Sequence, residues 1–192
     1  MGSDHGPRLS QGGIPRCRPR RLESAVLPQC GGRIGGMTTS ARNRVRVRGF
    51  AEGDRDVVVA LWARVFGEGA PRNAPGPMLD RKLAQGDGLV WVAEDRPGGA
   101  IVGAVAAGYD GVRGWIYHLA VDEAHRRRGI ASALLRAAEA ELVRRGCPKV
   151  NLQVMGSNAA VVALYEAAGY AVEDRISMGR VLDDGRRPPA NS

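Results

Sequence analysis

Cysteine is scarce in this chain, and its cysteines are spread far apart. Cys17, Cys30 and Cys147 form no Cys-x-x-Cys pair and have no paired-histidine spacing beside them. An odd number at such distances argues against a disulfide framework, and the absent ligand spacing argues against structural zinc, so we expect no metal site. We interpret Cys147 as structural, since Gly146 and Pro148 beside it mark a turn.

Long apolar runs are also absent. No window approaches the roughly 18 to 20 apolar residues that a membrane span needs. The N-terminal stretch has arginines but lacks the apolar core of about 7 to 15 residues found in secretory signals. We therefore expect no membrane span and a cytoplasmic location. The length of 192 residues favours one domain, and 44% hydrophobic with 25% charged residues is an ordinary globular mixture.

Acidic residues are outnumbered, which gives the chain a net charge of +8. Eight arginines and two carboxylates fall within residues 1–44, so most of this excess lies there. Residues 1–43 are rich in Gly, Pro, Ser and Arg without apolar periodicity, and we predict a disordered extension, with Met37 as the functional start. The alternative is an arm that binds nucleic acid or a protein. Because the remainder is nearly neutral, nucleic acid is not the expected partner of the folded part.

A folded domain is predicted over residues 44–184, beginning with an antiparallel meander. Val45 to Arg48 alternates as a half-exposed strand does, Asp54 is a candidate N-cap, and Asp110-Gly111 fits a hairpin turn. The expected elements are strand 45–48, helix 54–67, loop 67–77, helix 79–84, and strands 89–93, 101–107 and 115–121.

The second half of the domain alternates helix and strand. Apolar residues from Ala131 follow helical spacing up to Gly146, and Ser157 or Asn158 is a candidate cap. The expected elements are helix 131–146, strand 150–155, a helix up to Ala168, strands at about 170–174 and 176–182, and a tail at 185–192. This order predicts a mixed sheet covered by helices.

One segment carries most of the chemical information: Arg126-Arg127-Arg128-Gly129-Ile130-Ala131, between a predicted strand and an amphipathic helix. A turn there presents backbone N–H groups at a helix N-terminus, where they suit a pyrophosphate. Gly129 lets phosphate oxygens approach closely, and the arginines add charge-assisted contacts. No Gly-Lys-Ser/Thr follows, so this is not a Walker loop. The alternative is an ordinary basic helix start.

Arg126-x-x-Gly129-x-Ala131 resembles the [RQ]-x-x-G-x-[GA] motif of GNAT N-acetyltransferases. The strand from His118 to Asp122 is similar to the family's LAV-D/P strand. The N…LYE…GF segment of the family is matched in spacing by Asn158, Tyr165, Gly169 and Tyr170. The resemblance spans roughly 45–182, and the YpeA subgroup of bacteria is the most similar through Arg81–Leu83, Tyr109–Gly111 and Gly146–Lys149. It implies the GNAT fold, an α/β (α+β) domain with a mixed, mostly antiparallel sheet of six to seven strands and helices on both faces.

The resemblance also implies acetyl-CoA as co-substrate and assigns residues to it. Leu119, Ala120 and Val121 would follow the pantetheine arm, with the backbone of the first and last pairing like an added strand. The pyrophosphate would be held by Arg126, Arg127, Arg128, Gly129, Ile130, Ala131 and Ser132. Asn158 would contact the cofactor, and the Tyr165 hydroxyl would protonate the departing thiolate. A phenol is neutral at pH 7 and can donate that proton; the alternative for Tyr165 is a core aromatic.

The family's usual general base is missing. An acceptor amine is mostly protonated at pH 7 and must lose a proton. The fourth strand carries no glutamate: one of its faces holds Trp115, Tyr117, Leu119 and Val121. The fifth-strand position where ribosomal-protein N-terminal acetyltransferases have a glutamate is Gln153. A water chain ordered by Tyr117, His118 or carbonyl groups is the route left. Alternation puts His118 on the face opposite Tyr117, so we interpret it as a core or surface histidine.

Two functions from different classes follow. The leading one is an N-acetyltransferase that transfers acetyl directly from acetyl-CoA to a primary amine of a small molecule or peptide. The alternative is a domain that binds acyl-CoA as a sensor without turnover, which the missing base favours and Tyr165 opposes. The acceptor site is expected near Trp62, residues 72–78 and Tyr109. Many members of the family form homodimers, so a homodimer is compatible with the resemblance.

Overall fold

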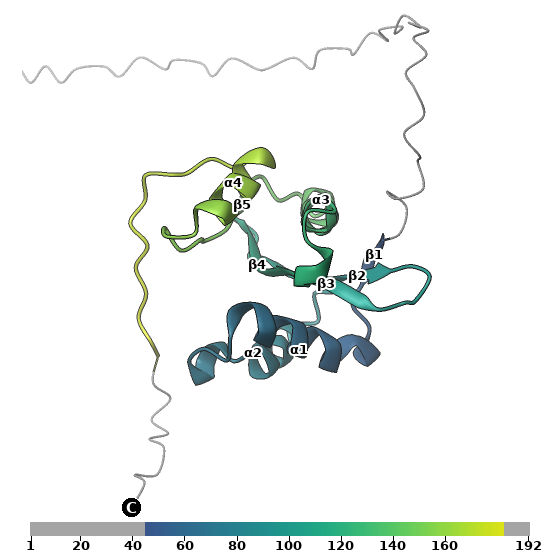
Figure 1. Ribbon diagram of the computed structural model, residues 1–192. Coiled ribbons are helices and arrows are strands. Elements are labelled where there is room, and N and C mark those ends of the chain that lie inside the picture. Colours follow the sequence, from purple (N-terminus) through teal and green to yellow (C-terminus); the bar gives the residue numbers. More distant parts are fainter. Residues whose placement is uncertain (1–44, 183–192) are drawn as a thin grey trace, which may run out of the picture. The chain divides into compact units, whose positions relative to one another are not determined.

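A five-stranded sheet lies between two layers of helices in the computed structural model, which describes residues 45–182 (Figure 1). The strands are β1 (Val45–Gly49), β2 (Val90–Asp95), β3 (Ile101–Tyr109), β4 (Gly114–Val121) and β5 (Val150–Asn151). The α-helices are α1 (Arg55–Phe66), α2 (Pro75–Leu83), α3 (Ile130–Arg144) and α4 (Ala159–Ala167). Short 3-10 helices are η1 (Glu52–Asp54), η2 (Pro71–Asn73) and η3 (Glu123–His125). The predicted extension 1–43 and tail 185–192 lie outside the described residues.

The sheet is mixed and mostly antiparallel, as predicted. Its strand order is β1-β2-β3-β4-β5, with antiparallel pairing up to β4 and parallel pairing between β4 and β5. The parallel step requires a crossover connection, which α3 supplies. Between residues 45 and 182, none of the helices combines the length and the apolar character that crossing a membrane requires.

Each face of the sheet has its own core. Trp62 of α1 and Leu79 of α2 are fully buried against Ala104 and Ala106 on one face. Trp62 is therefore a core residue and does not line an acceptor site. On the other face, α3 packs closely because β3 has Gly103 there: an added Cβ would lie 3.0 Å from a methyl group of Leu134. α3 and α4 lie on this second side, with α1 and α2 opposite (Figure 1).

The two predicted helix caps have different outcomes. Asn158 caps α4 as predicted, since its side-chain oxygen accepts a 3.3 Å hydrogen bond from the Val161 N–H. Asp54 occupies the N-cap of α1 but makes no capping bond. Its carboxylate instead accepts from the Arg48 guanidinium at 2.7 and 2.8 Å and from the Ala51 N–H at 2.8 Å. Asp54 therefore ties β1 to the chain entering α1.

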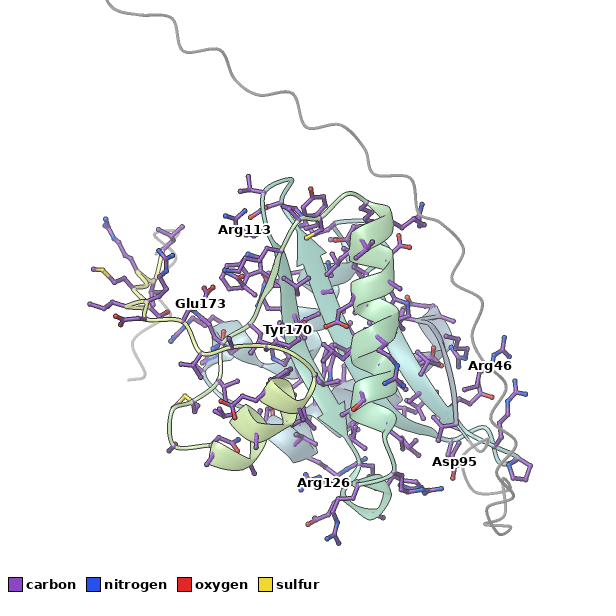
Figure 2. The ribbon with its side chains drawn as sticks, turned by 90° about the horizontal axis from the view of Figure 1, so that it is seen from above. Arg46, Asp95, Arg113, Arg126, Tyr170 and Glu173 are labelled. Atoms are coloured by element: carbon purple, nitrogen blue, oxygen red, sulfur yellow. The ribbon has the colours of Figure 1, made fainter. Side chains whose placement is uncertain are left out.

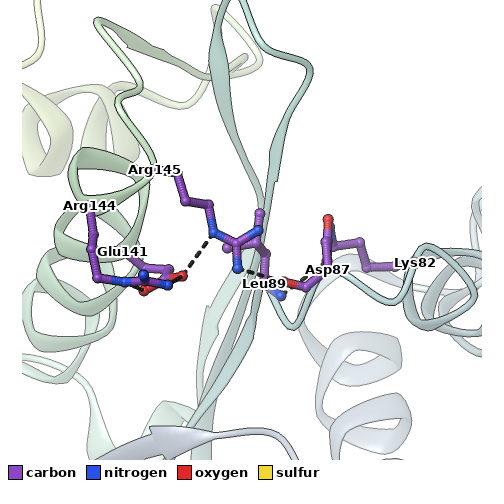
Figure 3. A network of polar contacts seen from close by, with 6 residues as sticks. All are labelled: Lys82, Asp87, Leu89, Glu141, Arg144 and Arg145. Atoms are coloured by element: carbon purple, nitrogen blue, oxygen red, sulfur yellow. Dashed lines mark hydrogen bonds and ion pairs between the residues drawn. The ribbon is translucent and has the colours of Figure 1, made fainter.

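A polar network joins α3 to the segment between α2 and β2 (Figure 3). Arg145 donates to the Glu141 carboxylate at 2.8 Å and to the Asp87 carbonyl oxygen at 2.7 Å. The Asp87 side chain in turn accepts from Lys82 of α2 at 2.5 Å. Hydrogen bonds from Arg144 and Arg145 lower the pKa of Glu141 to about 2, so this carboxylate stays ionised at neutral pH. The network fixes the C-terminal end of α3 beside the start of β2.

The predicted strand count was too high. The strand predicted at 150–155 ends at Asn151, and those at 170–174 and 176–182 are not formed. A strand needs a neighbour for its backbone hydrogen bonds, and the segment after Asn151 diverges from β4. The last segment contacts the residues on either side of β5 through side chains: Lys149 pairs with Glu173, and Gln153 donates to the Ser177 hydroxyl at 2.7 Å.

Candidate functional site

Two left-handed backbone positions shape the turn between η3 and α3. Arg127 has φ 59° and Gly129 has φ 77°. Ile130, the first residue of α3, is buried in the core. Within the described part of the chain, no protein acceptor is found for the backbone N–H groups from Arg127 to Ser132. Successive free N–H groups in such a turn, at the positive end of a helix dipole, are the arrangement that suits an anion, and we call Arg127 to Ser132 the nest.

Side chains behind the turn brace it. His125 contacts the Asp122 carboxylate at 3.2 Å and the Asp95 carboxylate at 3.6 Å. The hydrogen bond from His125 is the main cause that lowers the pKa of Asp122. Arg128 pairs weakly with Asp95 at 3.8 Å. Arg126 is exposed and extends from the N-terminal end of α3 (Figure 2), which adds positive charge beside the nest.

β4 is paired on one side only over most of its length. β5 pairs with it at just two positions, Gly114 with Val150 and Trp115 with Asn151. Beyond them, within residues 45–182, this edge has no neighbouring strand. A cavity of about 200 Å³ opens there, lined by Trp115, Ile116, Tyr117, His118 and Gln153. An open strand edge accepts an extended ligand through main-chain hydrogen bonds.

The three residues predicted to follow an extended ligand lie on this open strand. Leu119 and Val121 direct their side chains to the core beneath α3. Ala120 is buried in the core beneath α1. Their side chains are therefore engaged in packing, and what they offer a ligand is backbone. The strand leads through Asp122 and η3 into the nest, so the open edge and the nest are continuous along the chain.

Tyr165 and Asn158 both lie on α4 or at its start, outside the residues that line the cavity. Tyr165 is buried, with only 9% of its surface exposed, and burial raises the pKa of its hydroxyl. Within residues 45–182 its hydroxyl has no hydrogen-bond partner. Its ring packs edge-on against Tyr170 with the centroids 5.6 Å apart. Asn158 is exposed, and its side-chain oxygen is occupied by the cap of α4.

Comparison with known proteins adds a decisive finding. The sequence profile of the Acetyltransferase (GNAT) family matches residues 56–170. The chain belongs to this family. An acetyltransferase of Sodalis glossinidius is 39% identical over 142 residues, which cover 73% of this chain and 98% of the relative. An acetyltransferase of Pectobacterium atrosepticum is 41% identical, over 74% of this chain and 99% of the relative.

The fold agrees with that assignment. The crystal structure of an aminoglycoside N-acetyltransferase in complex with CoA superposes with a TM-score of 0.60, at 19% sequence identity, over 71% of this chain and 94% of that one. The GNAT fold predicted from sequence is confirmed, with five strands in place of six to seven. This GNAT acetyltransferase uses acetyl-CoA as acetyl donor and an amine as acceptor.

The residues present fit acetyl-CoA chemically. A pyrophosphate needs several hydrogen-bond donors and positive charge, which the nest from Arg127 to Ser132 and its arginines offer. The pantetheine arm carries two amide groups and is extended, which suits an open strand edge. Gly129 has no atom within 4 Å of where its Cβ would lie, so a ligand can approach the turn unobstructed.

His118 lies on the other face from the one predicted. β4 has a bulge at which His118 and Leu119 together face Val105, and His118 has φ 48°. Its ring contacts Trp62 and Phe66 of α1, with centroids 5.2 and 5.1 Å apart.

Tyr117 lies on this same face. A Cβ at Gly108 would lie 3.3 Å from the Tyr117 ring, and Gly108 shares the alternation of Ala104 and Ala106, which face α1. The period of two that separates neighbours in a regular strand does not hold across a bulge. Tyr117 and His118 are therefore on one side of the sheet, and both line the cavity.

Sequence reasoning also missed a pair that holds Tyr165. The Tyr170 hydroxyl donates to the Glu139 carboxylate of α3 at 2.7 Å. Glu139 is half-buried on α3. The available signal in the sequence was its spacing: it lies four residues after the buried Leu135, and residues four apart are neighbours on a helix surface. The other polar residue of the cavity, Gln153, donates to Ser177 and cannot act as a base.

Proposed function

We propose that this enzyme acetylates a primary amine by direct transfer, with the nest from Arg127 to Ser132 holding the pyrophosphate of acetyl-CoA. In this proposal the backbone of Leu119 to Val121 pairs with the pantetheine arm, Asn158 contacts the cofactor, and Tyr165 protonates the departing thiolate. One observation carries it: a run of free N–H groups opens a 15-residue helix and adjoins an unpaired strand edge.

Tyr165 is suited to donate a proton. Burial raises the pKa of its hydroxyl above the ordinary value near 10, so the proton is retained throughout the neutral range. A hydroxyl without a protein acceptor is free to donate to a leaving group. Donation becomes favourable when a thiolate forms nearby, since an unsolvated anion strengthens that hydrogen bond.

The cofactor site is tested by calorimetric titration with acetyl-CoA and CoA. Gly129→Glu puts a negative side chain at the nest, and we expect it to weaken binding at least tenfold. Gly86→Glu is the matched control, because Gly86 is also left-handed, with φ 63° and open space around its Cβ position. Equal affinity of the two variants would overturn the assignment of the nest.

The acid is tested by Tyr165→Phe. We expect kcat to fall by about a hundredfold, within the usual range for a general acid, with the acetyl-CoA Kd little changed. Measuring kcat and Kd for this variant and the wild type also separates an enzyme from the alternative, an acyl-CoA sensor without turnover. A protein that binds acetyl-CoA but acetylates no member of a broad amine screen would favour the sensor. A cytoplasmic location, a homodimer and the YpeA-like subgroup stay predictions.

A further inference from the structure

We propose that His118 is the general base that removes the proton from the acceptor amine. The inference rests on the proposed function, because it needs acetyl-CoA bound along β4. His118 takes the place of the missing carboxylate base, since the fourth strand has no glutamate and the fifth-strand position is Gln153.

The bulge in β4 is what places His118 at the reaction centre. Because two residues face Val105 there, His118 joins Tyr117 on the α1 side of the sheet and lines the cavity at the open edge. A positive φ is uncommon for a residue other than glycine, and such conformations concentrate at functional sites. The ring is held by contacts to Trp62 and Phe66, so its orientation is fixed before any ligand arrives.

The surroundings of His118 keep its imidazole neutral. Burial lowers the pKa of His118 below its ordinary value of 6.5, and no nearby charge opposes this effect. The charged residues of α1 are occupied elsewhere: Arg55 pairs with Asp56 and Asp80, and Arg64 pairs with Asp122. Across the cavity, Tyr117 and Gln153 are uncharged at pH 7. Within residues 45–182 the ring nitrogens of His118 have no hydrogen-bond partner, so a lone pair is available.

The protons of the transfer then balance. The alkylammonium of the acceptor gives one proton to His118, which returns it to solvent. The freed amine attacks the thioester carbonyl carbon, the C–N bond forms, and the C–S bond breaks. Tyr165 protonates the departing thiolate, and the second proton lost by the nitrogen restores Tyr165 through water. The sum is one amide, one thiol and one released proton, with no oxidant or reductant.

Bromoacetyl-CoA tests the placement of His118 without an identified acceptor. This analogue carries a reactive carbon next to the thioester, and a neutral imidazole displaces its bromide to form a stable adduct. We expect peptide mass spectrometry to locate the adduct on His118 and excess acetyl-CoA to prevent it. Labelling should increase with pH through a pKa below 6.5. An analogue that binds in competition with acetyl-CoA without labelling His118 would overturn this inference alone. Failure of acetyl-CoA to bind overturns the proposed function as well.

The pH profile of turnover tests the role. With an amine that the wild type acetylates, we expect His118→Asn to lower kcat about a hundredfold and to remove the acidic limb of the kcat profile. Asn tolerates a positive φ, so this variant should keep its fold, and an unchanged acetyl-CoA Kd will show it. An acidic limb that persists in His118→Asn would rule out His118 as the base.

Discussion

The Tyr170 hydroxyl donates a 2.7 Å hydrogen bond to the Glu139 carboxylate and so joins the chain leaving α4 to the middle of α3. Figure 2 shows Tyr170 beside these helices. Burial and the Glu139 carboxylate both raise the pKa of Tyr170, so it remains a donor. Because the Tyr170 ring also packs against the Tyr165 ring, the bond supports the position of Tyr165.

Tyr170→Phe should therefore affect stability and catalysis together. We expect a loss of about 1.5–3 kcal/mol of unfolding free energy, the usual contribution of a hydrogen bond to a charged group. We also expect kcat to fall severalfold with the acetyl-CoA Kd unchanged. Urea denaturation and steady-state kinetics measure the two effects. Tyr109→Phe is the control: within residues 45–182 its hydroxyl bonds Gly111 and Gly146, at 3.2 and 3.4 Å, and Tyr109, expected near the acceptor site from sequence, is not among the residues that line the cavity. Equal kinetic effects of the two variants would contradict the prediction.

Gly114 is required where β4, β5 and α3 meet. An added Cβ would lie 2.9 Å from the Cys147 sulfur and 3.1 Å from a Leu142 methyl group. We expect Gly114→Ala to destabilise the fold by about 1–3 kcal/mol through overpacking. Gly49→Ala, with no atom near its Cβ position, is the matched control. Adding Cys147→Ala should recover part of the loss in a double-mutant cycle, and strict additivity would refute the contact.

Asp54 should make stability depend on acid pH. Hydrogen bonds from Arg48 lower the pKa of Asp54 in the folded state. Its contribution is therefore complete above the unfolded pKa near 3.9 and is lost as pH falls through the lower folded pKa. Asp54→Asn should lower the unfolding free energy by about 1–3 kcal/mol at pH 7. Denaturation from pH 6 to pH 3 should show this difference shrinking below pH 4, and a constant difference would be evidence against the pairing.

Arg127 permits a test of backbone against side chain at the nest. With φ 59°, a residue other than glycine is strained by about 1 kcal/mol. Both Arg127→Ala and Arg127→Gly remove the guanidinium, but only the glycine variant relieves the strain. We expect Arg127→Gly to be about 1 kcal/mol more stable than Arg127→Ala. We also expect Arg127→Gly to bind CoA with a Kd within about threefold of the wild-type value. A large loss of affinity in both variants would mean that the guanidinium holds the phosphate.

Local sequence signals predicted most of the fold. Asn158 capped its helix as expected, and the apolar period from Ala131 to Leu142 gave α3 nearly to its ends, Ile130 and Arg144. The failures were tertiary. Val172, Ile176 and Met178 alternate like strand residues, yet each is at least 77% exposed because no strand edge meets them. Alternation alone does not supply a hydrogen-bonding neighbour.

Prediction of the site from sequence was limited in the same way. The residues of the turn could be found because Gly129 and the arginines precede an amphipathic pattern directly. The face of His118 could not, since nothing in Tyr117-His118-Leu119 marks a bulge, and a positive φ at histidine is set by the strands on either side. The Glu139–Tyr170 pair joins residues 31 positions apart and depends on how α4 is placed against α3.

The bulge has a consequence for how such a protein can evolve. The side chains of β4 on either side of the bulge pack into one hydrophobic core or the other, so most substitutions among them disturb packing. At the bulge His118 and Leu119 together face Val105, so His118 has no ladder partner of its own. A single codon change there exchanges the chemistry offered to an acceptor, and the packing it alters is limited to the contacts of the ring with Trp62 and Phe66. We therefore expect diversity of acceptors among descendants of one scaffold to arise at this position.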